Sequence, residues 1–226
     1  MKIDLKEFIE KYKNEINNRL FVKIYSLTTA GELGQSDIGK LTELFYKCGI
    51  DPLEYLENVP YCYAYGSALK DIKIPDRIIS IGKRAFAFCA DLTNVVIPDS
   101  VNSIYYQAFY SCTELTSIII PDSVTSISNE VFYNCGRLTS VTIPSSVYSI
   151  GISAFHNCSG LARLTIPRRV TSIGDYAFWE CYSLKTIDYA GNKEQWRSIS
   201  KGTNWGGGTF IKVVHCIDGD IKYDII

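Results

Sequence analysis

Five cysteines recur along this chain at intervals of 23 residues, and thiols in such a row could do several kinds of chemistry. They are Cys89, Cys112, Cys135, Cys158 and Cys181. In a secreted chain the row could form disulfides, and beside histidines it could bind zinc or supply a nucleophile. Parallel side chains on one line do not cross readily, however, and five is an odd number. We therefore expect small, buried, reduced thiols.

The two histidines do not complete a metal site. His156 lies two residues before Cys158 and His215 precedes Cys216, and neither pair has a second pair at zinc-site spacing. A catalytic thiol needs a lowered pKa and an oriented base, which apolar surroundings do not provide. The glycines at 206–208 lack the Lys-Ser/Thr and the helix that follow a phosphate-binding loop. The sequence therefore predicts no enzyme, no metal site and no cofactor.

The cysteines belong to a larger repeat that must position them. Ile-Pro pairs begin at residues 74, 97, 120, 143 and 166, again 23 apart. The same interval separates Phe86, Phe109, Phe132, Phe155 and Phe178. A fixed period in this range is typical of a solenoid, in which each repeat is one coil and neighbouring coils bury each other's apolar edges. Within a coil, Val95 and Ile97 alternate as in a strand that Pro98 ends, and Ile104 is a second inward anchor.

The full repeat resembles a known family. The pattern Leu-x-x-Ile-x-Ile-Pro-x-x-Val-x-x-Ile, followed by Ala-Phe-x-x-Cys, is similar to the BspA-like leucine-rich repeats of bacterial proteins. Five full copies run from Ile74 to Asp188, and a degenerate half-copy around Tyr63 precedes them. The resemblance implies a right-handed leucine-rich-repeat solenoid that binds proteins or cell surfaces. We predict an α/β repeat solenoid: a short coil stack with a 23-residue period and a cap at each end.

Three parts follow from this reading: a helical N-terminal cap over 1–60, the repeats over 61–188 and a C-terminal cap over 189–226. Apolar spacing predicts helices over 4–18 and from Ser36 to Cys48, and a short third helix from Asp51-Pro52 to about Asn58. At the other end, Asn192 is expected to cap a short helix over 193–199. A strand over 210–216, a turn at Asp218-Gly219 and a return strand over 221–226 are expected to extend the sheet.

Composition excludes several partners. The chain is 46% hydrophobic and 21% charged with a net charge of −1, so no basic field attracts nucleic acid. No stretch approaches the roughly 20 apolar residues that span a bilayer, so no membrane insertion is expected. The charged segment Met1–Glu7 has no secretion-signal pattern, which together with free thiols favours a cytoplasmic location. A cell-surface location is the alternative if a signal has been removed.

Two rows of side chains are candidates for binding. The first follows the phenylalanines and consists of Tyr110, Tyr133, His156 and Trp179. Rings at a variable position are typical contact residues, but they could equally shelter the phenylalanines of adjacent coils. The second row lies on the outward side of the strands, the face that the family resemblance implies, and its candidates are Lys70, Lys73, Asn94, Arg163 and Lys185.

We therefore predict a non-enzymatic module that binds a protein partner of unknown identity. It could be a surface adhesin or host-interaction protein. The alternatives are an intracellular adaptor or inhibitor, from a bacterium or its mobile elements, and a structural protein that associates with itself. A monomer is expected, with dimerisation through the C-terminal sheet edge as the alternative.

Overall fold

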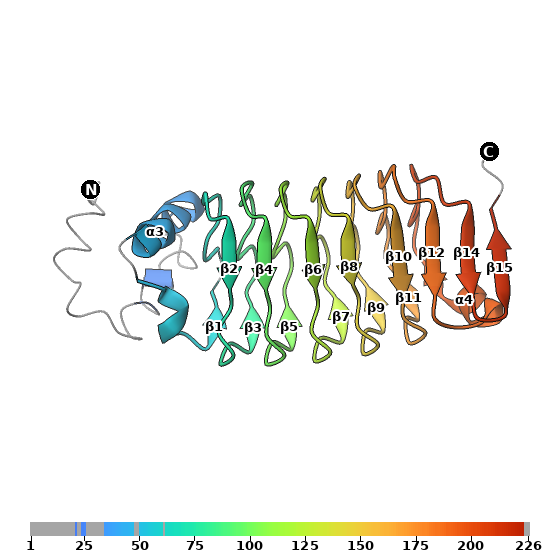
Figure 1. The fold of residues 1–226 in the computed structure, drawn as a ribbon, viewed down its shortest axis with the longest axis horizontal. Coiled ribbons are helices and arrows are strands. Elements are labelled where there is room, and N and C mark those ends of the chain that lie inside the picture. The colour runs from blue at the N-terminus through green and yellow to red at the C-terminus, as the bar shows by residue number, and fades with distance from the viewer. Residues whose placement is uncertain (1–20, 22–23, 26–33, 48–49, 61, 224–226) are drawn as a thin grey trace.

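The chain winds into a stack of coils with a helical unit at its N-terminal end and a hairpin at its C-terminal end (Figure 1). The computed structural model describes residues 21, 24–25, 34–47, 50–60 and 62–223. Each full coil has a strand on each of two sides and turns on the third. Over residues 62–188 the coils contain strands and turns but no helix. The predicted solenoid and its 23-residue period are confirmed.

The longer strands form one side of the stack, which we call the strand face. They are β2 (Asp71–Lys73), β4 (Asn94–Val96), β6 (Ser117–Ile119), β8 (Ser140–Thr142), β10 (Arg163–Ile166), β12 (Thr186–Tyr189) and β14 (Val213–Cys216). In β4 and β6 the middle residue is buried and both neighbours are exposed, as strand alternation requires. Paired strands of this face are parallel, and within the repeats they are offset by 23 residues, so that Ser117 faces Ser140.

A second row of shorter strands follows the proline turns. These are β1 (Asn58–Val59), β3 (Ser80–Ile81), β5 (Ser103–Ile104), β7 (Ser126–Ile127), β9 (Ser149–Ile150), β11 (Ser172–Ile173) and β13 (Ser200–Lys201). In the repeats, serine lies half-buried at the rim and isoleucine points into the core. Strand β1 pairs in parallel with β3, so the coil stack extends into the segment expected to be the N-terminal cap.

The third side consists of turns that need an unusual backbone. In one coil Gln107 and Ser111 have φ values of 57° and 56°, and residues at the same positions of the other coils also have positive φ. That conformation is unfavourable for residues other than glycine, asparagine and aspartate. Main-chain hydrogen bonds to the next coil offset its cost: Ser111 N donates to Tyr133 O at 2.7 Å, and Phe109 N donates to Val131 O at 3.0 Å.

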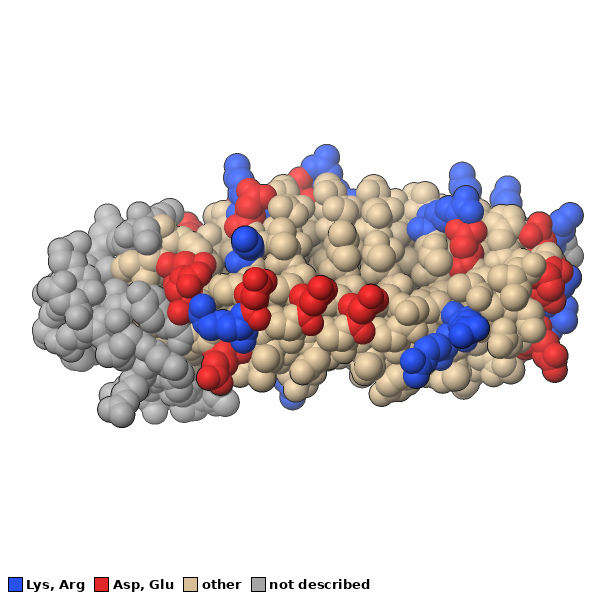
Figure 2. Space-filling model, turned by 60° about the horizontal axis from the view of Figure 1, so that its bottom comes forward, with Lys and Arg blue, Asp and Glu red and all other residues tan. Residues whose placement is uncertain are grey.

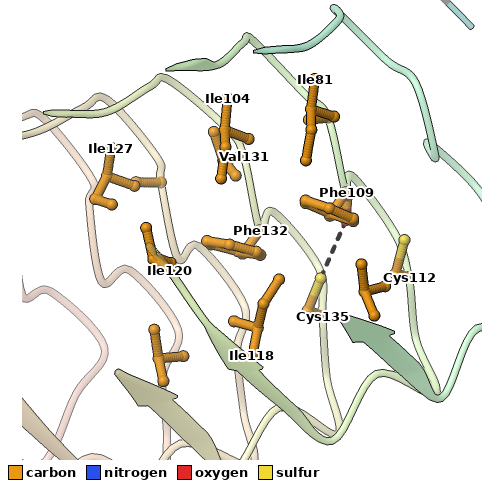
Figure 3. Close-up of a cluster of buried hydrophobic side chains, with 14 of the residues drawn as sticks. Ile81, Ile104, Phe109, Cys112, Ile118, Ile120, Ile127, Val131, Phe132 and Cys135 are labelled. Carbon is orange, nitrogen blue, oxygen red and sulfur yellow. Dashed lines mark hydrogen bonds between the residues drawn. The ribbon is translucent and has the colours of Figure 1, made fainter. Parts of the chain in front are cut away.

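The core is a set of ladders in which each coil contributes one member. Phe109 and Phe132 stack at 5.7 Å between ring centroids, and both are fully buried. The cysteines form another ladder, in which Cys135 donates to the carbonyl oxygen of Phe109 at 3.2 Å (Figure 3). The described row of cysteines from Cys89 to Cys181 is buried, as predicted.

At the N-terminal end, α3 (Gln35–Lys47) packs on the first coil. The contact is close, because a Cβ on Gly39 would lie 1.8 Å from the carbonyl oxygen of Tyr65. The helix was predicted to begin at Ser36 but begins one residue earlier, because the carbonyl of Gly34 already accepts the N–H groups of Asp37 and Ile38. The helix predicted over 4–18 lies outside the described residues.

The third predicted helix is shorter than expected. It is one 3₁₀ turn, η2 (Pro52–Tyr55), in which the Asp51 carboxylate accepts a hydrogen bond from Leu53 N. Asn58 is in strand β1 instead, because it falls in register with Ser80. Arg77 of the first full coil joins the two units: its Nε donates to Leu56 O at 3.0 Å and its Nη1 lies 3.3 Å from Glu54.

At the C-terminal end, Asn192 and Gln195 make a reciprocal cap on α4 (Lys193–Ser198), and Trp196 and Ile199 are buried. Residues 200–208 then occupy the place of a further coil. Phe178 N donates to Trp205 O, as the equivalent phenylalanines donate to the next coil within the repeats. Strand β14 extends the strand face, and the return strand β15 (Gly219–Lys222) starts earlier than predicted, because Gly219 already pairs with Cys216. Residues 224–226 lie outside the described part.

Candidate functional site

The geometry of the cysteine ladder indicates a structural role. Each thiol donates to a main-chain carbonyl of the preceding coil, as in Cys158 Sγ to Phe132 O at 3.1 Å. Burial raises the pKa of Cys89 to about 11 and that of Cys135 to about 12, since a thiolate would lose its hydration there. A nucleophile needs the opposite shift. The ladder therefore fills space and satisfies carbonyl groups.

The histidines lie apart from the thiols that neighbour them in the sequence. His215 Nδ1 is 2.7 Å from Asp220 Oδ1 at the hairpin, whereas the His156 ring stacks on Tyr133 with its Nδ1 buried and without a hydrogen-bond partner among the described residues. Burial lowers the pKa of His156, so its neutral form is favoured. Within the described part of the chain, no group of three or more His, Cys, Asp and Glu side chains could hold a metal ion.

The first predicted row is a continuous stack of half-buried rings. Tyr110 and Tyr133 stack at 4.8 Å, and Tyr133 and His156 at 4.4 Å, with planes within 12° of parallel. Their faces therefore contact one another, and their edges reach the surface. Trp179 departs from the stack and turns toward the C-terminal end, where its ring would lie 2.2 Å from a Cβ on Gly207. The structure thus brings together three of the four predicted rings.

Two further rings extend this stack, and sequence reasoning missed both. In the first full coil the ring position is occupied by buried Ala87, and the next residue, Phe88, supplies the ring instead. Phe88 lies 5.1 Å from Tyr65 and 5.2 Å from Tyr110. We call Tyr65, Phe88, Tyr110, Tyr133 and His156 the outer ring ladder.

The presence of a phenylalanine at position 88 is the least expected feature of this ladder. Its φ is 60°, and its side chain is 45% exposed. The equivalent residues in the next coils are polar: Ser111, Asn134 and Asn157, and they are joined by side-chain hydrogen bonds. A bulky exposed ring in a left-handed conformation is disfavoured on both counts. Such a local exception is a signal for function.

The second predicted row lies on the strand face, and all five of its residues are exposed. Lys70 precedes β2, Lys73 is the last residue of β2, Asn94 begins β4, and Lys185 precedes β12. Arg163 differs from the others because its guanidinium donates two hydrogen bonds to the carboxylate of Asp188 on the neighbouring strand. It is therefore less available to a partner than the three lysines.

The strand face also carries an apolar centre that the sequence reading missed. Val96 at the end of β4 is 48% exposed, and Ile119 at the end of β6 is 70% exposed. Ile119 stands between buried Ile118 and Ile120, so composition alone suggests a core strand. The signal was alternation: with Ile118 inward, Ile119 must point outward. Polar residues surround the pair, including Ser117 and Thr142.

Charge is segregated along the proline turns at one border of the strand face. Figure 2 shows a row of acidic side chains toward the N-terminal end and a basic group toward the C-terminal end. The residues that follow the Ile-Pro pairs are Asp76, Asp99, Asp122, Ser145 and Arg168, and all five are exposed. A partner that reached over this border would meet opposite charges at its two ends. Such an arrangement fixes orientation more than affinity.

The described part of the chain contains no helix long and apolar enough to cross a membrane.

A model of the BspA-type leucine-rich repeat region matches residues 58–185 in six copies. Among solved structures, a leucine-rich repeat protein of T. pallidum is similar, with a TM-score of 0.59 and 30% identity over 66% of this chain and 67% of that protein. One from Bacteroides ovatus has a TM-score of 0.53 and 27% identity over 70% of this chain and 46% of its own.

A leucine-rich repeat protein from Eubacterium ventriosum shares the fold at 20% identity, with a TM-score of 0.53 over 73% of this chain and 50% of its own. The chain thus spans about half the length of the Bacteroides and Eubacterium proteins. No protein in the curated set matches the chain.

Proposed function

Because the chain belongs to the BspA-type leucine-rich repeat family, we propose that it is a non-enzymatic module that binds a protein through its strand face. The observation that carries this proposal is the exposure of Ile119 and Val96 on adjacent strands of an otherwise polar surface. An isoleucine that is 70% exposed contributes nothing to the core of the free protein, yet it could be buried by a partner.

The surroundings of this pair match the anatomy of a contact surface. Protein interfaces have an apolar centre and a polar rim, and charged residues are depleted at the centre. Strands β4, β6 and β8 carry no charged residue. Lysines lie at the margins, with Lys70 and Lys73 near one end and Lys185 near the other. The proposed partner therefore presents an apolar anchor with acidic groups on either side of it.

The outer ring ladder is a second candidate surface, favoured by Phe88. Its ring is exposed, and its backbone conformation would suit asparagine better. Because the rings of Tyr110, Tyr133 and His156 already contact one another, a partner would reach mainly their edges and the open side of Phe88.

The experiment that tests the proposal is capture of partners from the native cell, followed by titration calorimetry with two matched variants. Ile119→Asp places a charge at the apolar centre, and Ile152→Asp places one at an isoleucine that is 45% exposed outside the strands. We expect Ile119→Asp to weaken binding by about 30-fold or more, because truncated anchors typically cost 2 kcal/mol or more. Ile152→Asp is expected to bind as the natural chain does. Equal loss in both variants would contradict the strand-face proposal.

The biological setting has two forms within this proposal. In the first, the module is a surface adhesin or host-interaction protein, and in the second it is an intracellular adaptor or inhibitor. Protease treatment of intact native cells separates them. Digestion of the module without lysis supports the surface form, and protection until lysis supports the intracellular form.

A further inference from the structure

Strand β15 leaves one edge of the sheet open. It is the last member of the four-stranded sheet β10-β12-β14-β15 and runs antiparallel to β14. Figure 1 shows it as the outermost strand at the end opposite α3. No described strand pairs with its outer side. Main-chain groups on that side are therefore available to another strand.

The hydrogen-bond pattern identifies those groups. Tyr223 N donates to Lys212 O at 2.9 Å, so the main chain of Tyr223 points toward β14. In an antiparallel ladder the direction alternates from one residue to the next. Ile221 therefore also points toward β14, and the N–H and C=O groups of Asp220 and Lys222 point away from it.

We propose that β15 pairs with β15 of a second copy of this chain, antiparallel and about a two-fold axis at Ile221. In this register Asp220 lies opposite Lys222 of the partner subunit, and the symmetry repeats the pair. The four outward main-chain groups of each strand then form hydrogen bonds across the axis. A two-fold interface requires such a self-complementary patch, and opposite charges directly across a ladder stabilise it.

Both charged side chains of the proposed pair reach solvent. Lys222 is exposed and forms no ion pair with a described residue. Asp220 contacts His215 Nδ1, yet its side chain remains 46% exposed. Ile221 packs against the core beside buried Val214. Pairing would place it next to Ile221 of the partner subunit and remove further apolar area from water.

The hairpin is also held in place by its contacts with the end of the coil stack. Lys193 N donates to Asp218 Oδ1 at 2.9 Å, and Ile217 N donates to Gly191 O at 3.0 Å. Beyond the strand, Trp196 Nε1 donates to the hydroxyl of Tyr223 at 3.0 Å. Both ends of β15 are therefore anchored. An edge that is already ordered loses little conformational entropy when it pairs.

The pairing would join two strand faces end to end. Asp220 lies opposite His215, which continues the outward row that contains Asp188 on β12, so both copies would present their outward residues on the same side. Two linked faces would bind a repeated or surface-bound partner with avidity. An edge of four residues is small beside the roughly 800 Å² per partner of a stable interface, so we expect dimerisation that depends on concentration.

Sedimentation of the full chain over a concentration series tests this inference without any binding partner. We expect a monomer–dimer equilibrium in the natural chain. Lys222→Glu should weaken it by about tenfold or more, because two like-charge pairs replace two opposite pairs. The double variant Asp220→Lys with Lys222→Asp restores complementarity and should dimerise again. Lys83→Glu is the matched control, with the same charge change at an exposed lysine of the first full coil, and should behave as the natural chain.

Three sedimentation results would overturn the proposal. One is a natural chain that stays monomeric up to millimolar concentration. Another is a Lys222→Glu variant that dimerises as well as the natural chain and has an unchanged melting temperature. The third is a double variant that is folded but does not recover dimerisation. Capture of an extended peptide by a strictly monomeric chain would assign the edge to a different occupant and would also overturn it.

Discussion

Two ladders of aromatic rings run side by side through the coils, and from Phe109 to His156 their members are one residue apart in the sequence. In the inner ladder Phe109 and Phe132 stack within 8° of parallel and are fully buried. In the outer ring ladder Tyr110 and Tyr133 stack within 6° and are half-buried. The five full coils hold only phenylalanine at the inner position, but Ala, Tyr, Tyr, His and Trp at the outer one.

The difference shows that burial, and not stacking, restricts the residue type in this solenoid. A ring inside the stack must fit the space that the neighbouring coils leave, because protein interiors are close-packed. A ring at the rim can change type, as His156 does beside Tyr133. The strand face repeats the contrast, since Ile118 points inward and its neighbour Ile119 points outward. Outward positions are therefore the ones free to serve binding.

Phe132→Ala is expected to have the largest effect on stability. It removes a fully buried ring that stacks on Phe109 and Phe155, and it leaves a cavity in the middle of the stack. Comparable substitutions cost about 3–5 kcal/mol. Urea denaturation of the variant would measure the loss, and a cost below about 1 kcal/mol would show that the inner ladder does not hold the coils together.

The dependence of stability on alkaline pH should distinguish the buried thiols of the cysteine ladder from the half-exposed thiol of Cys216. The folded chain holds Cys89 and Cys135 protonated up to pKa values of about 11 and 12, whereas thiols of an unfolded chain ionise near 8.5. The unfolded state thus binds fewer protons between these values. The free energy of unfolding should be highest below about pH 8.5 and fall as the pH rises toward 11.

Urea denaturation at several pH values checks this expectation with a matched pair of variants. Cys135→Ala should flatten the alkaline decline, because the buried thiol that causes part of it is gone. Cys216→Ser, which changes a half-exposed thiol, should flatten it less. A decline that is the same in both variants and in the natural chain would rule out the inner thiols as its source.

Tyr133→Ala is the outer counterpart of Phe132→Ala. It removes stacking on Tyr110 and His156 but creates no closed cavity, so we expect a cost of about 0.5–1.5 kcal/mol. Thermal denaturation of both variants gives the comparison directly. If the two substitutions destabilise equally, the outer ring ladder is as much a part of the core as the inner one.

Phe88→Asn should have the smallest effect and the opposite sign. Asparagine suits the left-handed backbone at this position, and the same residue stands at the equivalent positions Asn134 and Asn157. We expect unchanged or slightly raised stability, by at most about 1 kcal/mol, since the relief of strain offsets the lost ring contacts. Marked destabilisation would show that Phe88 is held for packing. Unchanged stability with weaker partner binding would support the outer ring ladder as a contact surface.

The repetitive part of the fold follows from the sequence because every coil has the same residue pattern. Proline ends a strand, isoleucine turns inward, and the Phe and Cys ladders keep one register over five copies. The secondary structure of the non-repeating ends could be predicted less well. Asn58 belongs to a strand because Ser80 lies beside it, and nothing in the local sequence of Asn58 indicates that neighbour.

The candidate surfaces were only partly predictable for a related reason. Strand alternation alone places Lys73 outward, because it follows buried Ile72. Lys70 and Lys185 lie outside the strands, each two residues before a buried isoleucine, so alternation does not explain their exposure. The engagement of Arg163 with Asp188 depends on two residues 25 apart that the coil pitch brings together. Phe88 replaces the missing ring at Ala87 only because a backbone with positive φ directs it toward Tyr110.

Hydroxyl-radical footprinting of side chains, with and without the captured partner, tests the central claim most directly. The claim is that outward residues of the strand face bind while the inward ladders only hold the fold. It predicts strong protection of Val96 and Ile119 in the complex, with no change at Ile152. Protection confined to other surfaces, with Val96 and Ile119 as reactive as in the free chain, would contradict it.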